Sequence, residues 1–232
     1  DEKFASDLSN RIGIKFVSNK LNLQQHNQSH KLSENTLRDL RYKFLQEIAD
    51  KYNAKAILTA HTENDQAETV LMNIIRGTGI RGISGMKSNN NLFIKNHNTI
   101  KIYRLMLNIT HEQCKRFCSS LGIQPMLDSS NSKNIYFRNF IRNNTIPKIE
   151  KDFPNFIKKL SLLSQNSRKE LDLKDWAVKQ YYPLMIDIDY SIKKDQILLL
   201  PESLQSGIII KHIENLFKQK INIDNIHIRE II

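Results

Sequence analysis

The chain has 232 residues, enough to bury a sizeable hydrophobic core in one domain of ordinary size or in two small ones, and its seven glycines and five prolines exclude a low-complexity chain. Lys and Arg number 35 against 24 Asp and Glu, and this net charge of +11 raises the odds of a polyanionic partner such as nucleic acid, although a basic soluble protein stays an alternative. No apolar run approaches the roughly 18 residues of a membrane span, so we expect a soluble intracellular protein without membrane contact.

The first half of the chain alternates helical and strand-like patterns. In order, these predict helix 1–12, strand 14–17, helix 33–53, strand 54–60 and helix 65–76, the last ending before Gly77. Strands and helices in this alternation are typical of βαβ units. The fold class expected is therefore α/β with a parallel sheet.

The second half changes character. Residues 92–105 predict one or two further strands, and Thr110 is placed to cap the helix that follows. From about Asn139 onward the patterns are helical only. A charged stretch meets a proline just after Glu150, so we expect an α/β domain over 1–150 and a mostly helical domain over 151–232.

Both cysteines, Cys114 and Cys118, fall on the helix after Thr110, with His111 near the same face. A metal site would need a fourth ligand and usually a loop, so we expect reduced, half-buried side chains. Whether the chain holds a metal here stays open.

Ionisable residues crowd the end of strand 54–60, in the stretch "AHTENDQAET" over residues 60–69. In a parallel sheet, ligands bind at the carboxyl ends of strands, beside the N-termini of the following helices. Asp65 and Glu68 are three residues apart on the first turns of such a helix, and His61 precedes them by a further turn. This set is suited to Mg²⁺ on nucleotide phosphates or to an amine nucleophile, while helix capping by acidic residues is the simpler alternative.

The longer string "AHTENDQAETVLMNIIRGTGIRGISGM", residues 60–86, resembles the second signature of the PP-loop ATPases that modify tRNA, and among them of the tRNA(Ile)-lysidine synthetases. Residues 37–45 are similar to the family helix with paired arginines, and residues 127–150 to its Asp-x-Ser-Asn and Arg-Asn-x-x-Arg segment. Residues 200–217 are similar to its small helical domain. The resemblance therefore extends over nearly the whole chain.

The resemblance implies a Rossmann-like parallel sheet of the PP-loop ATPase type, followed by a small, mostly helical domain. It implies a ligase that uses ATP and Mg²⁺ to adenylate the anticodon wobble cytidine of tRNA(Ile), after which L-lysine displaces AMP to form lysidine. A homodimer is compatible with it. Lys outnumbers Arg, and Asn and Ile are abundant, as expected from an AT-rich genome, so the cytoplasm of a small bacterium and a plastid stroma are both expected locations.

The resemblance also implies roles for individual residues. Asp65 and Glu68 are expected to bind the lysine ammonium or the metal, and Arg41 to face developing phosphate charge, although a solvated helix edge is the alternative for Arg41. The nucleotide-binding residues expected are His61, Arg76 and Gly77.

An RNA contact is predicted from the residues Arg138, Asn139 and Arg142. The two arginines, four apart, form a one-sided basic pair beside Phe137 and Phe140, which suits an RNA backbone with stacked bases. An amphipathic helix with its aromatic residues in the core is the alternative.

The phosphate-binding loop of the family, Ser-Gly-Gly-x-Asp-Ser, is not found in the sequence. We expect a fragment that lacks a first βαβ unit and does not turn over ATP as it stands, with true loss of the loop as the alternative.

Two other functions stay open. The first is a PP-loop tRNA thiolase, but such enzymes commonly use Cys-x-x-Cys, and this chain has Cys114-x-x-x-Cys118 instead. The second is a non-catalytic RNA-binding remnant, which the absent phosphate loop permits and the intact "HTENDQAET" argues against.

Overall fold

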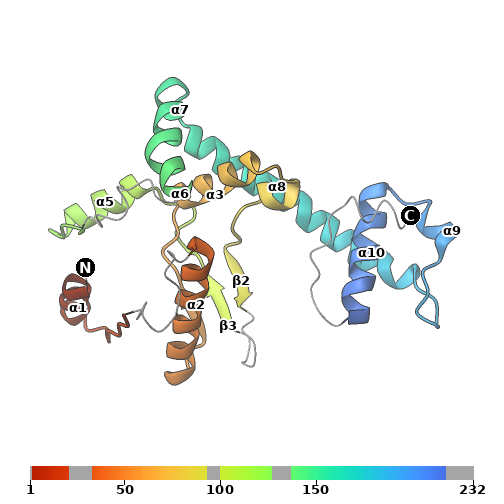
Figure 1. Cartoon of the computed structure of the whole chain (residues 1–232), viewed down its shortest axis with the longest axis horizontal. Helices are drawn as coiled ribbons and strands as arrows, with labels where there is room; N and C mark the ends of the chain where they lie inside the picture. Colours follow the sequence, from red (N-terminus) through yellow and green to blue (C-terminus); the bar gives the residue numbers. More distant parts are fainter. Residues whose placement is uncertain (1, 21–32, 93–99, 127–136, 218–232) are drawn as a thin grey trace. The chain divides into compact units, whose positions relative to one another are not determined.

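The computed structural model describes residues 2–20, 33–92, 100–126 and 137–217 (Figure 1). Two compact units are found, one of Asp1–Gly77 with Gly85–Leu162 and the other of Thr78–Ser84 with Leu163–Ile232. The elements of the first unit are α1 (Glu2–Arg11), α2 (Glu34–Lys51), β1 (Ala56–Leu58), α3 (Glu63–Ile75), β2 (Asn89–Leu92), β3 (Ile100–Tyr103), α5 (His111–Ser120), α6 (Phe137–Phe140), a π-helical turn η3 (Ile141–Thr145) and α7 (Ile146–Asp152).

A mixed sheet with strand order β1-β3-β2 forms the centre of the first unit. β1 pairs in parallel with β3, so that Ile57 lies opposite Ile102, while β2 pairs antiparallel with β3. The predicted α/β class is confirmed, and the antiparallel β2 is an addition to the expected parallel sheet. Because β1 and β3 are parallel, their carboxyl ends meet at the same edge.

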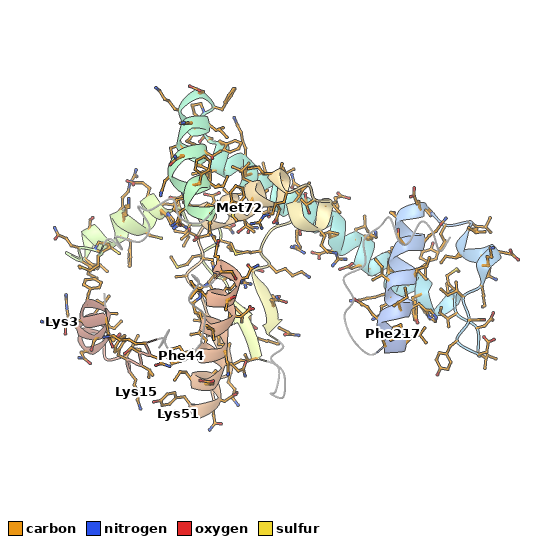
Figure 2. The ribbon with its side chains drawn as sticks, viewed as in Figure 1. Lys3, Lys15, Phe44, Lys51, Met72 and Phe217 are labelled. Atoms are coloured by element: carbon orange, nitrogen blue, oxygen red, sulfur yellow. The ribbon has the colours of Figure 1, made fainter. Side chains whose placement is uncertain are left out.

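The strand predicted over residues 14–17 is wrong. These residues have no sheet partner, and the side chain of Ile14 is 59% exposed. The ammonium of Lys15 instead lies 4.5 Å from the ring centre of Tyr52, which the Lys51 ammonium also approaches. Figure 2 shows Lys15 near Lys51, at the end of α2. A short apolar run does not by itself identify a strand, because it lacks a period long enough to specify one.

α2 covers one face of the sheet (Figure 1). Its N-cap Ser33 accepts a hydrogen bond from the Thr36 amide, as expected for a helix that begins after serine. The buried core on this face contains Tyr42, Ala49, Ile57, Ile100 and Ile102. Full burial of each large aliphatic side chain contributes about 1.5–3 kcal/mol, so this core fixes α2 against β1 and β3.

α3 follows β1 after a short connection and is the most buried helix of the first unit. Thr62 and Asp65 form a reciprocal capping box at its start. Ala67 and Val70 are fully buried, and Met72 is 8% exposed. The N-terminus of α3 is thereby held rigidly at the carboxyl edge of the sheet.

A tight turn at Gly85 supports the buried side of α3. Gly85 has a φ of +56°, and the Gln66 side chain makes two hydrogen bonds with Met86, at 2.8 Å to its amide and 3.2 Å to its carbonyl. A Cβ added at Gly85 would lie 2.8 Å from the Gln66 side-chain nitrogen.

We expect Gly85→Ala to lower the free energy of unfolding by about 2–4 kcal/mol, because it combines a positive φ with overpacking against Gln66. Gly122→Ala is the matched control, since Gly122 has a φ of +66° but nothing within 4 Å of the added Cβ. The control should cost only about 1–2 kcal/mol. Urea unfolding of both variants measures the difference, and equal losses would show that the contact with Gln66 is not restrictive.

The segment 137–152 is helical, as predicted from Asn139 onward, but its middle is a π-helical turn. Ile141 and Ile146 are buried on its inner side. The wider turn displaces the side chains after it relative to an ordinary α-helix. Arg142 lies within this turn and Arg138 one turn before it.

The second unit contains α4 (Ile80–Ile83), η4 (Tyr182–Leu184), α9 (Lys194–Ile197) and α10 (Glu202–Phe217), together with most of α8 (Phe156–Tyr181). Its core contains Val178, Met185, Ile197, Ile208 and Ile209. The Ser84 carbonyl accepts hydrogen bonds from Ser164 and Arg168, which ties Thr78–Ser84 to α8. The second unit therefore begins at Leu163 and also includes Thr78–Ser84, whereas the sequence placed the domain boundary near Glu150.

Within the described residues, none of the helices has the length and apolar character needed to cross a membrane.

Candidate active site

A pocket of about 640 Å³ opens at the carboxyl edge of the sheet in the first unit. Its walls come from α2, from the connection between β1 and α3, and from the segment containing α6 and η3. The lining residues are Glu34, Leu37, Arg38, Arg41, Tyr42, Leu45, Thr59, Ala60, His61, Asp65, Arg138, Asn139 and Arg142. The structure thus brings together six of the nine site residues predicted from the sequence, and it adds Glu68 through its contacts with Arg138 and Arg142.

Glu68 is held by two arginines. Its side chain is only 2% exposed. One carboxylate oxygen accepts a 2.6 Å hydrogen bond from Arg142 Nε, and the other accepts from Arg138 Nε at 2.8 Å and from Arg142 Nη2 at 2.9 Å. Charged hydrogen bonds of this kind compensate a buried carboxylate that would otherwise be strongly destabilising.

Asp65 has two sets of partners, one for each carboxylate oxygen. Oδ2 accepts from the backbone N–H and the hydroxyl of Thr62, at 2.8 and 2.7 Å, which completes the capping box of α3. Oδ1 accepts from Nη2 of Arg142 at 3.0 Å and of Arg138 at 3.3 Å. Asp65 therefore caps the helix and also belongs to the charged cluster, so the two interpretations of the sequence are not exclusive.

The environment keeps Asp65 ionised. Burial alone would raise the pKa of Asp65, but contacts from His111 and Thr62 and the positive charge of Arg138 hold this pKa well below its usual range. His111 Nε2 lies 3.7 Å from Oδ2. Asp65, Glu68, Arg138 and Arg142 form what we call the charged quartet, in which two negative and two positive side chains balance.

His61 lies beside the quartet without carrying a charge. Its Nδ1 is 2.9 Å from the hydroxyl of Thr59. Burial first, and then the positive charge of Arg104, lower the pKa of His61 to about 4, and the opposing effect of Asp65 is smaller. At neutral pH the imidazole is therefore an uncharged hydrogen-bonding group in a pocket rich in arginine.

The depressed pKa of His61 predicts a pH dependence of folding. Between about pH 6.5 and 4 the unfolded chain binds a proton at this residue and the folded protein does not, so stability falls as the pH is lowered through that window. We expect about 1–2 kcal/mol from this source, less than the full shift would give, because solvent screens the partly exposed ring. His61→Asn should flatten that part of a urea-unfolding profile against pH, and an unchanged slope would contradict the assignment. The pKa of Asp65 is also depressed from its ordinary value of 3.8, so the stability that Asp65 contributes is lost only as the pH falls below about that value.

Arg104 does not line the pocket but acts on His61 through its charge, and this role was not predicted from the sequence. It directly follows β3, its side chain is 6% exposed, and Nη1 donates to the Lys87 carbonyl at 3.0 Å. Its Nε has no hydrogen-bond partner among the described residues. A signal was present, because the first polar residue after a buried strand parallel to β1 must lie at the same edge as His61.

The face of α2 toward the pocket is cationic and aromatic. Arg38 donates a long 3.5 Å hydrogen bond to the Tyr42 hydroxyl, and the guanidinium carbons of Arg38 and Arg41 lie 4.9 and 5.8 Å from the Tyr42 ring centre. Tyr42 is 7% exposed, and its ring holds the guanidinium groups of both side chains by cation–π contact. Arg41 is thus in the pocket as expected, and its role toward phosphate stays a prediction.

Arg76 and Gly77 do not line the pocket. They lie at the C-terminal end of α3, away from Asp65 in its first turn, and Arg76 packs 5.4 Å from the Phe137 ring centre. Gly77 has a φ of +74°, typical of a glycine that ends a helix. The structure gives their expected nucleotide contact no support, and residues 127–136 of the resembling Asp-x-Ser-Asn segment lie outside the described residues.

Cys114 and Cys118 are free and half-buried on α5, as expected. In the ranges that the structure describes, no group of three or more His, Cys, Asp and Glu side chains could hold a metal ion. The carboxylates expected to bind Mg²⁺ are paired with arginines instead. As arranged, the described residues therefore do not fit Mg²⁺, whereas Arg38 and Arg41 on α2 provide positive charge that fits an anionic phosphate group.

Comparison with known proteins identifies the family. The PP-loop domain matches residues 1–149, and the chain belongs to the PP-loop family. Over its whole length the chain is 30% identical to a tRNA(Ile)-lysidine synthase of Clostridium perfringens, 28% to that of Clostridium tetani and 29% to one of Bacillus cereus. In each case it spans about half the length of the relative, 49%.

The fold is also found among solved structures. One example is the U34-tRNA thiolase NcsA from Methanococcus maripaludis with its [4Fe-4S] cluster, with a TM-score of 0.54 and 17% identity, covering 73% of this chain and 55% of that one. This likeness shows the common architecture of the two chains.

Proposed function

We propose that the chain forms the substrate pocket of a tRNA-modifying ligase that uses ATP to adenylate the wobble cytidine of tRNA(Ile) and then attaches lysine to form lysidine. The observation that carries the proposal is the charged quartet at one side of an arginine-lined pocket. The names of the relatives support it, although the chain spans only about half their length.

Different residues of the pocket are suited to the three substrates of such a reaction, ATP, lysine and tRNA. Arg38 and Arg41 on α2 supply positive charge for the phosphates of ATP and of the adenylate. Asp65 and Glu68 supply negative charge for the ammonium groups of lysine. Uncharged His61 adds a hydrogen-bonding group beside the nucleotide without further positive charge. Arg138, Asn139 and Arg142 are the proposed contacts to the RNA.

Lysine transfer is preferred over sulfur transfer because of where the thiols lie. Neither Cys114 nor Cys118 lines the pocket, and both are on the separate helix α5. A thiolase would need a thiol or a sulfur carrier at the activated base. The carboxylates of the quartet have no comparable role in that reaction.

The test is an activity assay on the protein expressed from its full reading frame. With ATP, radiolabelled lysine and tRNA(Ile), we expect label in the anticodon nucleoside and release of one AMP for each lysine incorporated. Omission of ATP should abolish both. Incorporation of sulfur in place of lysine would support a thiolase, and tight tRNA binding without AMP release would support an RNA-binding remnant.

A further inference from the structure

In the charged quartet, the two carboxylates and the two guanidinium groups are paired with one another. All four oxygens of Asp65 and Glu68 accept hydrogen bonds, and Arg138 and Arg142 provide most of the donors. The side chains of the two arginines are 20% and 28% exposed, so both guanidinium groups are largely inside the protein. In this arrangement an ammonium group must compete with the arginines for the carboxylates, and a phosphate must compete with the carboxylates for the arginines.

Either ligand alone would leave a charge without a partner. An ammonium group that takes over Glu68 displaces the arginines into a wall that already contains Arg38 and Arg41. A phosphate that takes over the arginines leaves Glu68, 2% exposed, uncompensated. Separating one partner from a buried ion pair is strongly unfavourable because the other charge stays buried.

Both ligands together restore every pair. The phosphate accepts the guanidinium hydrogen bonds, the ammonium donates to the carboxylates, and no charge of the quartet is left unmatched. The position of Arg142 on a π-helical turn assists this exchange, since such turns interrupt the regular hydrogen-bond ladder. The exchange requires movement of two long side chains.

We infer that the quartet is a latch that couples the two ligands. A phosphate group of the RNA on Arg138 and Arg142 releases Asp65 and Glu68 to bind the ammonium of the amino-acid substrate, and the ammonium in turn favours binding of the phosphate. The inference rests on the proposed function for the identity of the amine. Typical couplings between sites change affinity about 5- to 150-fold, and we expect a factor in this range. Thermodynamic linkage requires the same factor in both directions.

The experiment uses the protein expressed from its full reading frame and isothermal titration at constant ionic strength, with inorganic tripolyphosphate as the anionic probe for the RNA phosphate. Lysine should bind about 5- to 150-fold more tightly in saturating tripolyphosphate, and tripolyphosphate should gain the same factor from lysine. Norleucine, which lacks the side-chain ammonium, should gain less than lysine.

Arg142→Gln tests whether the quartet carries the coupling. Removal of one guanidinium should raise the affinity for lysine in the absence of anion and bring the coupling factor close to one. Arg142→Lys keeps the charge and should retain part of the coupling. Arg116→Gln is the matched control, because Arg116 is 77% exposed on α5 and pairs only with Glu112 among the described residues. Its coupling should equal that of the unmodified chain.

The outcomes separate this inference from the proposed function. Lysine that binds equally well with and without tripolyphosphate would overturn the latch and leave the proposed function standing. Equal coupling in Arg142→Gln and the unmodified chain would also overturn it. Absence of lysine binding under both conditions would contradict the latch and the proposed function together.

Discussion

Replacement of Glu68 by alanine should lower the free energy of unfolding by about 3–5 kcal/mol, the loss typical of breaking a buried ion pair. The side chain is 2% exposed and accepts three hydrogen bonds from Arg138 and Arg142. Without it, both guanidinium groups keep only Asp65 as a carboxylate partner within the quartet. A cavity left by the lost methylenes adds to the destabilisation.

Chemical denaturation measures this loss, and Glu47→Ala provides the control. Glu47 is exposed on α2, so its replacement should change stability by no more than about 0.5 kcal/mol. A double variant, Glu68→Gln with Arg142→Gln, should recover part of the loss because it removes a charge of each sign. A Glu68→Ala protein as stable as the Glu47→Ala control would show that the quartet does not hold the first unit together.

Replacement of both Arg138 and Arg142 by alanine should weaken tRNA binding for all sequences alike. If each arginine contacts a phosphate once the latch is open, the dependence of log affinity on log salt should fall by about two units, one for each lost contact. The expected loss in affinity is largest at low salt, where released counterions contribute most. Electrophoretic or fluorescence titration at several salt concentrations measures the slope.

Lys115 and Arg116 provide a control for net charge alone. Both are exposed on α5, and their replacement by alanine removes the same two positive charges. We expect that variant to change affinity slightly and the slope by much less than two. An unchanged slope in the Arg138 and Arg142 variant would confine these arginines to the quartet, and the RNA contact would then belong to other basic residues.

The position of the candidate site could be predicted from the sequence because it follows from local rules. A buried strand followed by a capped helix places its ionisable residues at the sheet edge, and this is where His61, Asp65 and Glu68 lie. The partners of the carboxylates could not be predicted in this way. Arg138 and Arg142 lie 70 and 74 residues beyond Glu68, and only tertiary folding brings them to it.

Two other features show where sequence patterns are insufficient. The helical period over Arg138 and Arg142 correctly indicated a helix, but it does not distinguish an α-helical turn from the π-helical turn that contains Arg142. The same helical period, with the two arginines four residues apart, predicted a basic pair on one side of the helix. Their carboxylate partners come from α3. The positive charge of the segment is therefore compensated in the folded protein, which the segment alone does not reveal.

The most direct test of the central claim is lysidine formation by Asp65→Asn in the protein expressed from its full reading frame. Asparagine can keep part of the cap of α3 while it removes the negative charge offered to lysine. We predict that tRNA binding stays nearly unchanged and that lysine incorporation falls by at least about 100-fold, the lower end for the loss of an electrostatic group at a reacting centre. Full lysine incorporation, accompanied only by the loss of about 1 kcal/mol that a weakened cap causes, would contradict the account.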